Sequence, residues 1–290
     1  MVFRKMIKSL FSFLSSYFSI AHFNSNHDEF KKIYPDDFAV IFNSTYSNQI
    51  NTFGLYNKEL NEKILQIINK NNLNKNTFLD IGANIGDVSL YFSKVFNSVI
   101  CFEPHPKIFK ILEFNSENLS NIEIFNFGVA ENKSKLYQSK IFHNNFTAPA
   151  KKIKSENNYE IAAVNIDEFL DNKNLDLVNF INITVDGSEL DVLKGMKKLL
   201  KKNNVELLMV EADNLERIIK LSEYLKQNDF KFIYLYKKSL ELKKKNFIKI
   251  FLEKFSNKEK LIKINLEANF ENKINFGFNK NILFSKKELF

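Results

Sequence analysis

Residues 77–87 of the chain read TFLDIGANIGD, and this stretch decides the fold. Apolar and β-branched residues lead to Asp80, a loop with glycine at both ends follows, and a helical pattern begins at Val88. The pattern predicts a strand that stops at a carboxylate, a sharp turn, and a helix whose N–H groups face the crevice above a sheet. Doubly wound α/β proteins bind nucleotide-like ligands at such a point.

The spacing of the loop glycines indicates which ligand binds there. A dinucleotide fold needs the motif G-x-G-x-x-G, because its backbone must approach a pyrophosphate closely. Here Gly82 and Gly86 are four residues apart, Asn84 stands where the second glycine would be, and no lysine follows as in a Walker-type phosphate loop. Asp80 at the strand end suits a cationic group, and S-adenosylmethionine carries an ammonium and a sulfonium but no phosphate. The loop therefore favours S-adenosylmethionine over NAD.

A second predicted strand supports this interpretation. Residues 98–102 read SVICF, and Glu103 and Pro104 follow them. Glu103 lies 21 residues after Gly82, close to the offset of about 20 residues at which an acid binds ribose hydroxyls. Pro104 lacks an N–H group and marks the end of the strand. The alternative is an ordinary strand–helix–strand unit with acids at its strand ends.

Length and cysteine content bound the class of protein. The 290 residues allow one sizeable α/β domain plus extensions, or two small domains. The single cysteine, Cys101, excludes an intramolecular disulfide and a cysteine zinc cluster, and the sequence predicts no metal site. Because Cys101 falls inside the second predicted strand, we expect it to be a small buried hydrophobe.

Positive charge gathers in one region of the chain. Residues 236–263 contain ten Lys and three Glu, which accounts for most of the net charge of +8. One interpretation is a solvated lysine-rich helical face. The other is a docking surface for an anionic lipid headgroup, an acidic glycan or nucleic acid.

The N-terminal segment has a pattern of its own. Apolar residues recur at helical spacing between residues 3 and 21, with serines on much of the other side. The uncharged run of residues 9–21 is too short to span a bilayer. We expect residues 1–50 to form a helical accessory segment that docks on the core or on a partner, or that lies in a membrane interface. The expected location is the cytoplasm, with peripheral membrane contact through this helix or the Lys-rich region.

The rest of the chain predicts one α/β domain over residues 51–290, with the Lys-rich region as an excursion from it. Its fold class is a doubly wound, mostly parallel Rossmann-like sheet with helices on both faces, and a last strand or hairpin is expected within residues 274–284. Several strands end at polar residues: Asp80, Glu103, Asn126, Asp186 and Glu211. Carboxyl ends of parallel strands share one edge of a sheet, so these side chains predict a binding site there.

Two local features flank that edge. Ser188 is expected to cap the helix after the fourth strand, with Glu189 in its first turn. Residues 142–158 are polar with little periodicity, and they contain His143. We expect them to form a loop that covers the site.

These motifs resemble the FkbM-type S-adenosylmethionine-dependent methyltransferases, a family of small-molecule and sugar O-methyltransferases. The resemblance spans residues 52–212 and rests on GLY at 54–56, DIGANIG at 80–86, FEP at 102–104 and VDGSELDVLKG at 185–195. It implies the class I methyltransferase fold and S-adenosylmethionine as cofactor. The family's fourth strand usually reads KIDVEG, whereas here Asn182 and Thr184 replace the lysine and the aspartate, and Asp186 replaces the glutamate.

The resemblance also implies roles for single residues. The implied cofactor-binding residues are Asp80, Gly82, Ala83, Asn84 and Gly86 around the methionine end, and Glu103, followed by Pro104, at the ribose. The candidate general bases are Asp186, Glu211, Glu189 and His143. Asp186 and Glu211 rank first because strand ends are rigid. The predicted function is O-methylation of a sugar or glycan precursor in bacterial surface polysaccharide biosynthesis, with a small-molecule or glycan acceptor as partner.

Three alternatives stay open at this point. A family member that binds the cofactor without turnover would account for Asn182 and Thr184. A nucleic-acid methyltransferase would account for the basic region, but the Asn/Asp-Pro-Pro-aromatic motif of amino-group methylases is missing after the fourth strand, and Cys101 is mid-strand. An NAD-dependent oxidoreductase lacks support because the middle glycine is absent.

Overall fold

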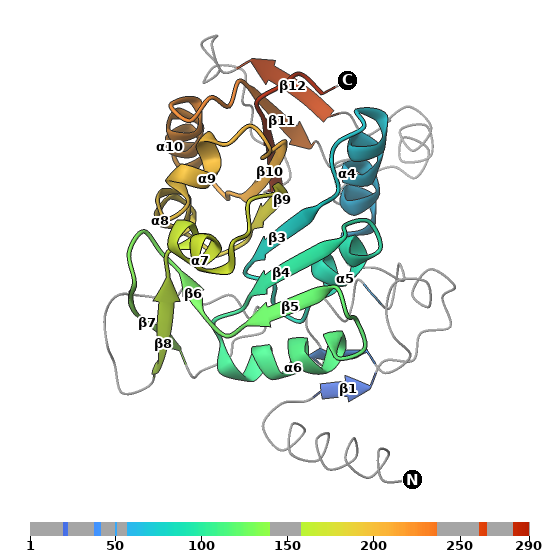
Figure 1. Ribbon diagram of the computed structural model, residues 1–290, viewed down its shortest axis with the longest axis vertical. Helices are drawn as coiled ribbons and strands as arrows, with labels where there is room; N and C mark the ends of the chain where they lie inside the picture. Colours follow the sequence, from blue (N-terminus) through green and yellow to red (C-terminus); the bar gives the residue numbers. More distant parts are fainter. Residues whose placement is uncertain are drawn as a thin grey trace, which may run out of the picture.

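Figure 1 shows the computed structural model of the chain, which describes residues 20–22, 38–41, 50, 57–139, 158–236, 261–265 and 281–289. Its centre is an eight-stranded sheet with the strand order β12-β11-β13-β10-β9-β3-β4-β5. The strands are β3 (Thr77–Ile81), β4 (Ser98–Phe102), β5 (Ile122–Phe125), β9 (Val178–Ile183), β10 (Leu207–Glu211), β11 (Phe232–Tyr236), β12 (Leu261–Asn265) and β13 (Asn281–Ser285).

Five neighbouring strands form the parallel part of this sheet. They pair in the order β5, β4, β3, β9 and β10. The chain therefore builds outward from β3 to β5, crosses back over the sheet, and builds outward from β9 in the other direction. Ligands of doubly wound proteins bind outside the carboxyl ends of the strands where the order reverses, which here is the edge above β3 and its neighbours.

The antiparallel end of the sheet completes the predicted topology. β13 lies between β10 and β11 and is antiparallel to both, and β12 pairs antiparallel with the outer edge of β11. The strand expected within residues 274–284 is thus confirmed as β13, and it is inserted into the sheet next to β10. Most of the Lys-rich region, residues 237–260, lies outside the described residues.

Helices cover both faces of the sheet, as predicted. Because successive side chains of a strand point to opposite faces, the buried strands contribute apolar side chains to two hydrophobic clusters, one on each face. Phe78 of β3 belongs to one cluster and Leu79 to the other, and both are fully buried. The first cluster takes in α4 (Lys58–Lys70), α5 (Asp87–Ser93) and α6 (Pro106–Ser116); the second takes in α7 (Ile166–Lys173), α8 (Glu189–Lys194), α9 (Lys197–Lys201) and α10 (Leu215–Lys226). In Figure 1, α4 and α5 lie to the right of the sheet, and α8 and α10 to its left.

A second, three-stranded sheet is formed by the part of the chain that connects β5 to β9. Its order is β6-β8-β7, formed by β6 (Gly128–Val129), β8 (Asn158–Val164) and β7 (Ser134–Ser139). Cys101 of β4 is fully buried, as expected. His143 lies in residues 140–157, outside the described residues, so its predicted role stays a prediction.

The described parts of residues 1–50 include strands where the sequence pattern favoured a helix. β1 (Ile20–His22) pairs antiparallel with β2 (Ala39–Ile41). Asn115 of α6 accepts the Ala39 N–H at 2.7 Å and donates to the Ala39 carbonyl at 3.0 Å. Phe38 and Val40 are fully buried in the same cluster as α6. Residues 38–40 thus share the core of the main sheet, and the domain boundary at residue 50 stays a prediction.

The predicted membrane contact falls largely on residues that the structure leaves undescribed. Residues 1–19 and 237–260 are among them. Within the described segments, no helix combines the length and apolar character that a membrane span requires.

Candidate active site

The turn after β3 carries the glycine motif and folds back over the neighbouring strand. The N–H groups of Gly82 and Ala83 both donate to the Phe102 carbonyl at the end of β4, at 2.9 and 3.0 Å. Gly82 has a φ of +86°, and a Cβ there would lie 2.0 Å from the carbonyl oxygen of Thr184. Backbone from β3, β4 and β9 therefore meets at this point, and only glycine fits.

Glu103 connects the end of β4 to this loop. Its Oε2 accepts the N–H of Asn84 at 2.9 Å, and its Oε1 accepts the N–H of His105 at 2.8 Å. The side chain is 5% exposed. Burial raises the pKa of Glu103 to about 7, although the two backbone hydrogen bonds act to lower it. The acid that the sequence places 21 residues after Gly82 is therefore held rigidly against the glycine loop.

Asp80 is buried beneath the loop, and both of its oxygens have protein partners. Ser89 of α5 donates to Oδ2 at 2.5 Å, and Asn182 of β9 donates to Oδ1 at 2.8 Å. Desolvation raises the pKa of Asp80 to about 6, against the lowering effect of these two bonds. Asp80 thus joins β3 to α5 and β9. Its direct contact with a ligand stays a prediction.

Asn182 stands where the resembling family carries a lysine, and the structure shows what it does instead. It bonds Asp80, and its Oδ1 lies 3.5 Å from the Thr184 hydroxyl. A neutral amide therefore takes the place of a cation beside a buried acid. Sequence reasoning noted the substitution but not the contact, because the pairing of Asp80 with Asn182 depends on the register of β3 and β9.

Asp87 is a site residue that sequence reasoning missed. It opens α5 directly after Gly86 and is 2% exposed. Its Oδ2 is buried and has no hydrogen-bond partner. Burial first, and then the charge of Asp80, raise the pKa of Asp87 to about 8. The available signal was the acid that ends the GANIGD motif.

Three buried carboxyl groups therefore surround the loop: Asp80, Asp87 and Glu103. Within the described residues, no lysine or arginine forms an ion pair with any of them. Burial disfavours their charged forms until a cation lies beside them. This environment fits a ligand with ammonium and sulfonium groups and no phosphate.

The turn after β9 lies at the same carboxyl edge of the sheet as the glycine loop. Asp186 has a φ of +48° and Gly187 a φ of +110°. The N–H of Gly187 donates to Oε1 of Glu189 at 2.7 Å. Glu189 is 2% exposed, and burial raises its pKa. The predicted cap by Ser188 is wrong, because Ser188 makes no side-chain capping bond.

Acids also follow or end two neighbouring strands at this edge of the sheet. Asp186 follows β9, and Glu211 is the last residue of the neighbouring strand β10. Both side chains are partly exposed. Asn126, after β5, donates to the carbonyls of Glu103 and Pro104 at 2.8 and 3.1 Å, so it holds the turn after β4. In the part of the chain that the structure describes, no three His, Cys, Asp or Glu side chains gather as metal ligands would.

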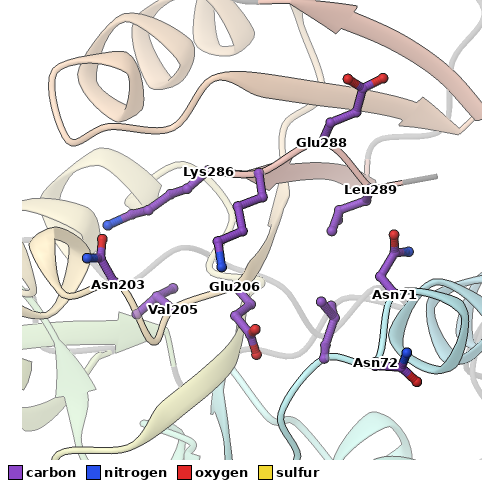
Figure 2. A pocket seen from close by; sticks show the side chains of 10 residues that line it. Asn71, Asn72, Asn203, Val205, Glu206, Lys286, Glu288 and Leu289 are labelled. Atoms are coloured by element: carbon purple, nitrogen blue, oxygen red, sulfur yellow. The ribbon is translucent and has the colours of Figure 1, made fainter.

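A separate pocket of about 270 Å³ lies at the opposite, amino-terminal edge of the sheet. Figure 2 shows its lining, which comes from the segments before β3 and β10 and the segment after β13. Its polar groups have internal partners: Glu206 accepts the Asn74 N–H at 2.7 Å, and Lys286 donates to the Lys202 carbonyl at 2.9 Å. None of the predicted site residues lines it.

The strand order, the glycine loop and the acids at the carboxyl edge together define a class I methyltransferase. Residues 80–240 match the model of the Methyltransferase FkbM domain. The match covers more than half of the chain, which therefore belongs to the FkbM methyltransferase family, as the motifs predicted. Residues 80–240 are therefore a methyltransferase domain, and S-adenosylmethionine is its cofactor. Family membership also removes the alternative of an NAD-dependent oxidoreductase.

Similarity to individual proteins is more distant. The hexuronic acid methyltransferase AglP of Haloferax volcanii is 28% identical over 135 residues, which are 46% of this chain and 55% of that protein. The chain thus spans about half the length of this curated relative.

Two solved structures resemble the fold at low sequence identity. The METTL16 MTase domain gives a TM-score of 0.48 at 11% identity, covering 96% of this chain and 92% of that one. A SAM-dependent O-methyltransferase from Thermotoga maritima gives 0.43 at 10% identity, covering 86% and 72%. Both scores are low, so the fold assignment rests on the strand order.

Proposed function

We propose that the protein methylates a hydroxyl group of a sugar or glycan precursor. The observation that carries the proposal is the position of two carboxylates: Asp186 follows β9, which pairs with the strand that leads into the glycine loop, and Glu211 ends β10, the next strand outward. Carboxylates at rigid strand ends can accept a hydroxyl proton next to a bound methyl donor.

The cofactor half of the crevice would be formed by residues predicted from the motifs. Gly82, Ala83, Asn84 and Gly86 shape the loop around the methionine end, with Asp80 below it, and Glu103 and Pro104 lie on the ribose side. When bound, S-adenosylmethionine supplies an electrophilic methyl group. The buried acids would stabilise its positive charges, since they lack a cationic partner among the described residues.

The acceptor half would be organised around Asp186. Asp186 adopts a left-handed backbone conformation with a φ of +48°. Such conformations cost free energy and gather at functional sites. Asp186 would remove the hydroxyl proton, and Glu211 is the second carboxylate at this edge. Glu189 is bonded to the Gly187 N–H, so its part is to hold the turn that carries Asp186.

The choice of a sugar acceptor is supported by relatedness. The similar protein from Haloferax volcanii is a hexuronic acid methyltransferase. The 28% identity supports a sugar as the class of acceptor, and a role in bacterial surface polysaccharide synthesis extends the same proposal. A cytoplasmic site of action would follow from such a role, because nucleotide-linked sugar precursors are made there.

The experiment compares methyl transfer from labelled S-adenosylmethionine to a panel of sugars by the wild-type protein and three variants: Asp186→Asn, Glu211→Gln and Glu216→Gln. Asp186→Asn should lower kcat by about 10²- to 10⁴-fold because the proton acceptor is lost. Its affinity for S-adenosylhomocysteine should stay within about twofold, since the cofactor half is untouched. Glu216→Gln, an exposed acid of α10 paired with Lys220, is the matched control and should retain full activity.

Two results would contradict the proposal. Transfer to non-sugar hydroxyls but to no sugar in the panel would reject the acceptor class. Retention of kcat in both Asp186→Asn and Glu211→Gln would reject a strand-end base.

A further inference from the structure

Arg217 lies against the turn that carries Asp186. It is in the first turn of α10, where the Asn214 side chain accepts its N–H at 2.9 Å. A Cβ at Gly187 would lie 2.6 Å from Arg217 Nη2, 3.3 Å from Cζ and 3.9 Å from Nη1. The guanidinium therefore packs on the backbone of Gly187, and any side chain at that position would displace it.

One end of the guanidinium is fixed and the other is available. Nη1 pairs with Asp213 Oδ1 at 3.0 Å, and the side chain of Arg217 is 36% exposed. Among the described residues, no hydrogen bond to Nη2 or Nε is formed. An anchored guanidinium with donors left over can bind a second oxyanion with two parallel bonds.

The composition of the chain makes this arginine unusual. Forty of its 42 basic residues are lysine, and the other arginine, Arg4, lies outside the described residues. A lysine in the first turn of α10 would have supplied the same charge. Only arginine supplies a planar fork that stacks on a backbone turn and binds a carboxylate or phosphate through two nitrogens.

The charges around the turn indicate what Arg217 can do. Arg217 acts on Glu189 to lower its pKa, and Asp186 acts to raise it, so the three groups share one small region. Acids alone would repel a negatively charged acceptor from Asp186. An arginine fixed beside these acids attracts a negatively charged group at one point, next to the turn that carries Asp186.

We infer that Arg217 binds an oxyanion carried by the acceptor and so orients the acceptor hydroxyl toward Asp186. The inference rests on the proposed function and specifies its substrate: an acidic rather than a neutral sugar. The oxyanion is either a carboxylate on the sugar ring or a phosphate of an activated sugar.

The test uses the full chain with saturating S-adenosylhomocysteine and three probes: 4-nitrophenyl glucuronide, 4-nitrophenyl glucoside and UDP-glucose. Calorimetry should show that the wild type binds at least one acidic probe more tightly than the neutral glucoside. Arg217→Gln should weaken that binding about 10- to 100-fold, because a charge-assisted pair of hydrogen bonds is lost. It should leave binding of the neutral glucoside unchanged.

Two more variants separate recognition from folding. Arg217→Lys keeps the charge without the fork and should recover part of the lost affinity. Lys220→Gln removes an exposed cation one turn further along α10 and should change nothing. Each variant should unfold at nearly the wild-type temperature, because exposed ion pairs contribute about 0–1 kcal/mol. If Arg217→Gln weakens binding of the glucuronide alone, the oxyanion is a carboxylate. If it weakens binding of UDP-glucose alone, the oxyanion is a phosphate.

Equal wild-type affinity for all three probes would overturn the inference, as would an equal loss for all three in Arg217→Gln. The proposed function fails separately. If the wild type methylates the neutral glucoside as fast as the acidic probes, the proposed function stands and the role of Arg217 falls. If the wild type methylates no sugar, the proposed function falls, and the binding differences alone decide whether Arg217 recognises an oxyanion.

Discussion

The two halves of the crevice differ in how they hold their acids. In the cofactor half, Asp80, Asp87 and Glu103 are 0%, 2% and 5% exposed. Burial raises all three pKa values, to between about 6 and about 8. In the acceptor half, Asp186 and Glu211 are partly exposed, and the exposed Asp213 is paired with Arg217.

This difference is consistent with the proposed division into a cofactor half and an acceptor half. Glu103 is held by two backbone N–H groups and Asp80 by the side chains of Ser89 and Asn182, and the charged forms of all three buried acids are penalised until a cation enters. Such a site suits one cofactor that always presents the same charges. Partly exposed side chains on a turn can serve acceptors of different shape, so we expect variants of the proposed acceptor half to change acceptor preference.

The largest expected effect comes from adding a methyl group to the loop of the cofactor half. Gly82→Ala places a Cβ 2.0 Å from the Thr184 carbonyl at a φ of +86°. We expect a loss of about 3 kcal/mol or more in the free energy of unfolding, because backbone from another strand must move. Chemical denaturation measures it.

Gly86→Ala is the matched comparison. Its φ is +92°, but the Cβ would meet only the leucine methyl groups of Leu112 and Leu90. Since side-chain ends can rotate away, the loss should be about 1–2 kcal/mol. If Gly86→Ala proves as costly as Gly82→Ala, the close approach of β9 to the loop is not what fixes the glycine.

The next effect concerns the acid of β4. Glu103→Gln should weaken binding of S-adenosylhomocysteine about 10- to 100-fold, because hydrogen bonds to a charged group are lost. Glu113→Gln, an exposed acid of α6, should bind like the wild type. The pKa of Glu103 is about 7, so wild-type affinity should rise as pH increases from 6 to 8 and the carboxylate forms. Calorimetry at several pH values with no such rise would argue against a carboxylate–ribose contact.

A smaller effect is expected from Asp87. The unfolded chain ionises this group near its usual pKa of 3.8, whereas the folded chain keeps the proton until about pH 8. The folded state is therefore increasingly penalised as pH rises through this window. Asp87→Asn should raise the unfolding free energy of the ligand-free protein by about 1–2 kcal/mol at pH 8 and by almost nothing at pH 4. Thermal unfolding of the wild type and the variant at both pH values measures this difference. If Asp87→Asn were less stable than the wild type at pH 8, the ionised Asp87 carboxylate would already be stabilised in the ligand-free fold.

Much of the cofactor half could be predicted from local sequence. The strand, the loop and the acid that follows β4 are consecutive features, so the order of residues along the chain is enough to place Asp80, Gly82 and Glu103 at one edge of the sheet. The doubly wound fold, the family and S-adenosylmethionine as cofactor are confirmed. Cofactor contacts of single residues stay predictions.

The contacts that sequence could not supply are those between distant elements. Asn182 meets Asp80 only because β9 pairs with β3 in one register. The sequence suggested Glu189 as a candidate base. In the fold its side chain is buried, and its carboxylate accepts the N–H of Gly187. β1 overlaps the end of the helical pattern of residues 3–21 and pairs with β2, and Ala39 of β2 is also bonded to Asn115.

The most direct measurement is a crystal structure of the protein with S-adenosylhomocysteine. The ribose hydroxyls should lie within hydrogen-bonding distance of Glu103, and the methionine end should follow the turn from Gly82 to Gly86 beside Asp87. A ligand bound elsewhere, or a Glu103 carboxylate still bonded only to the N–H groups of Asn84 and His105, would contradict the proposed cofactor site.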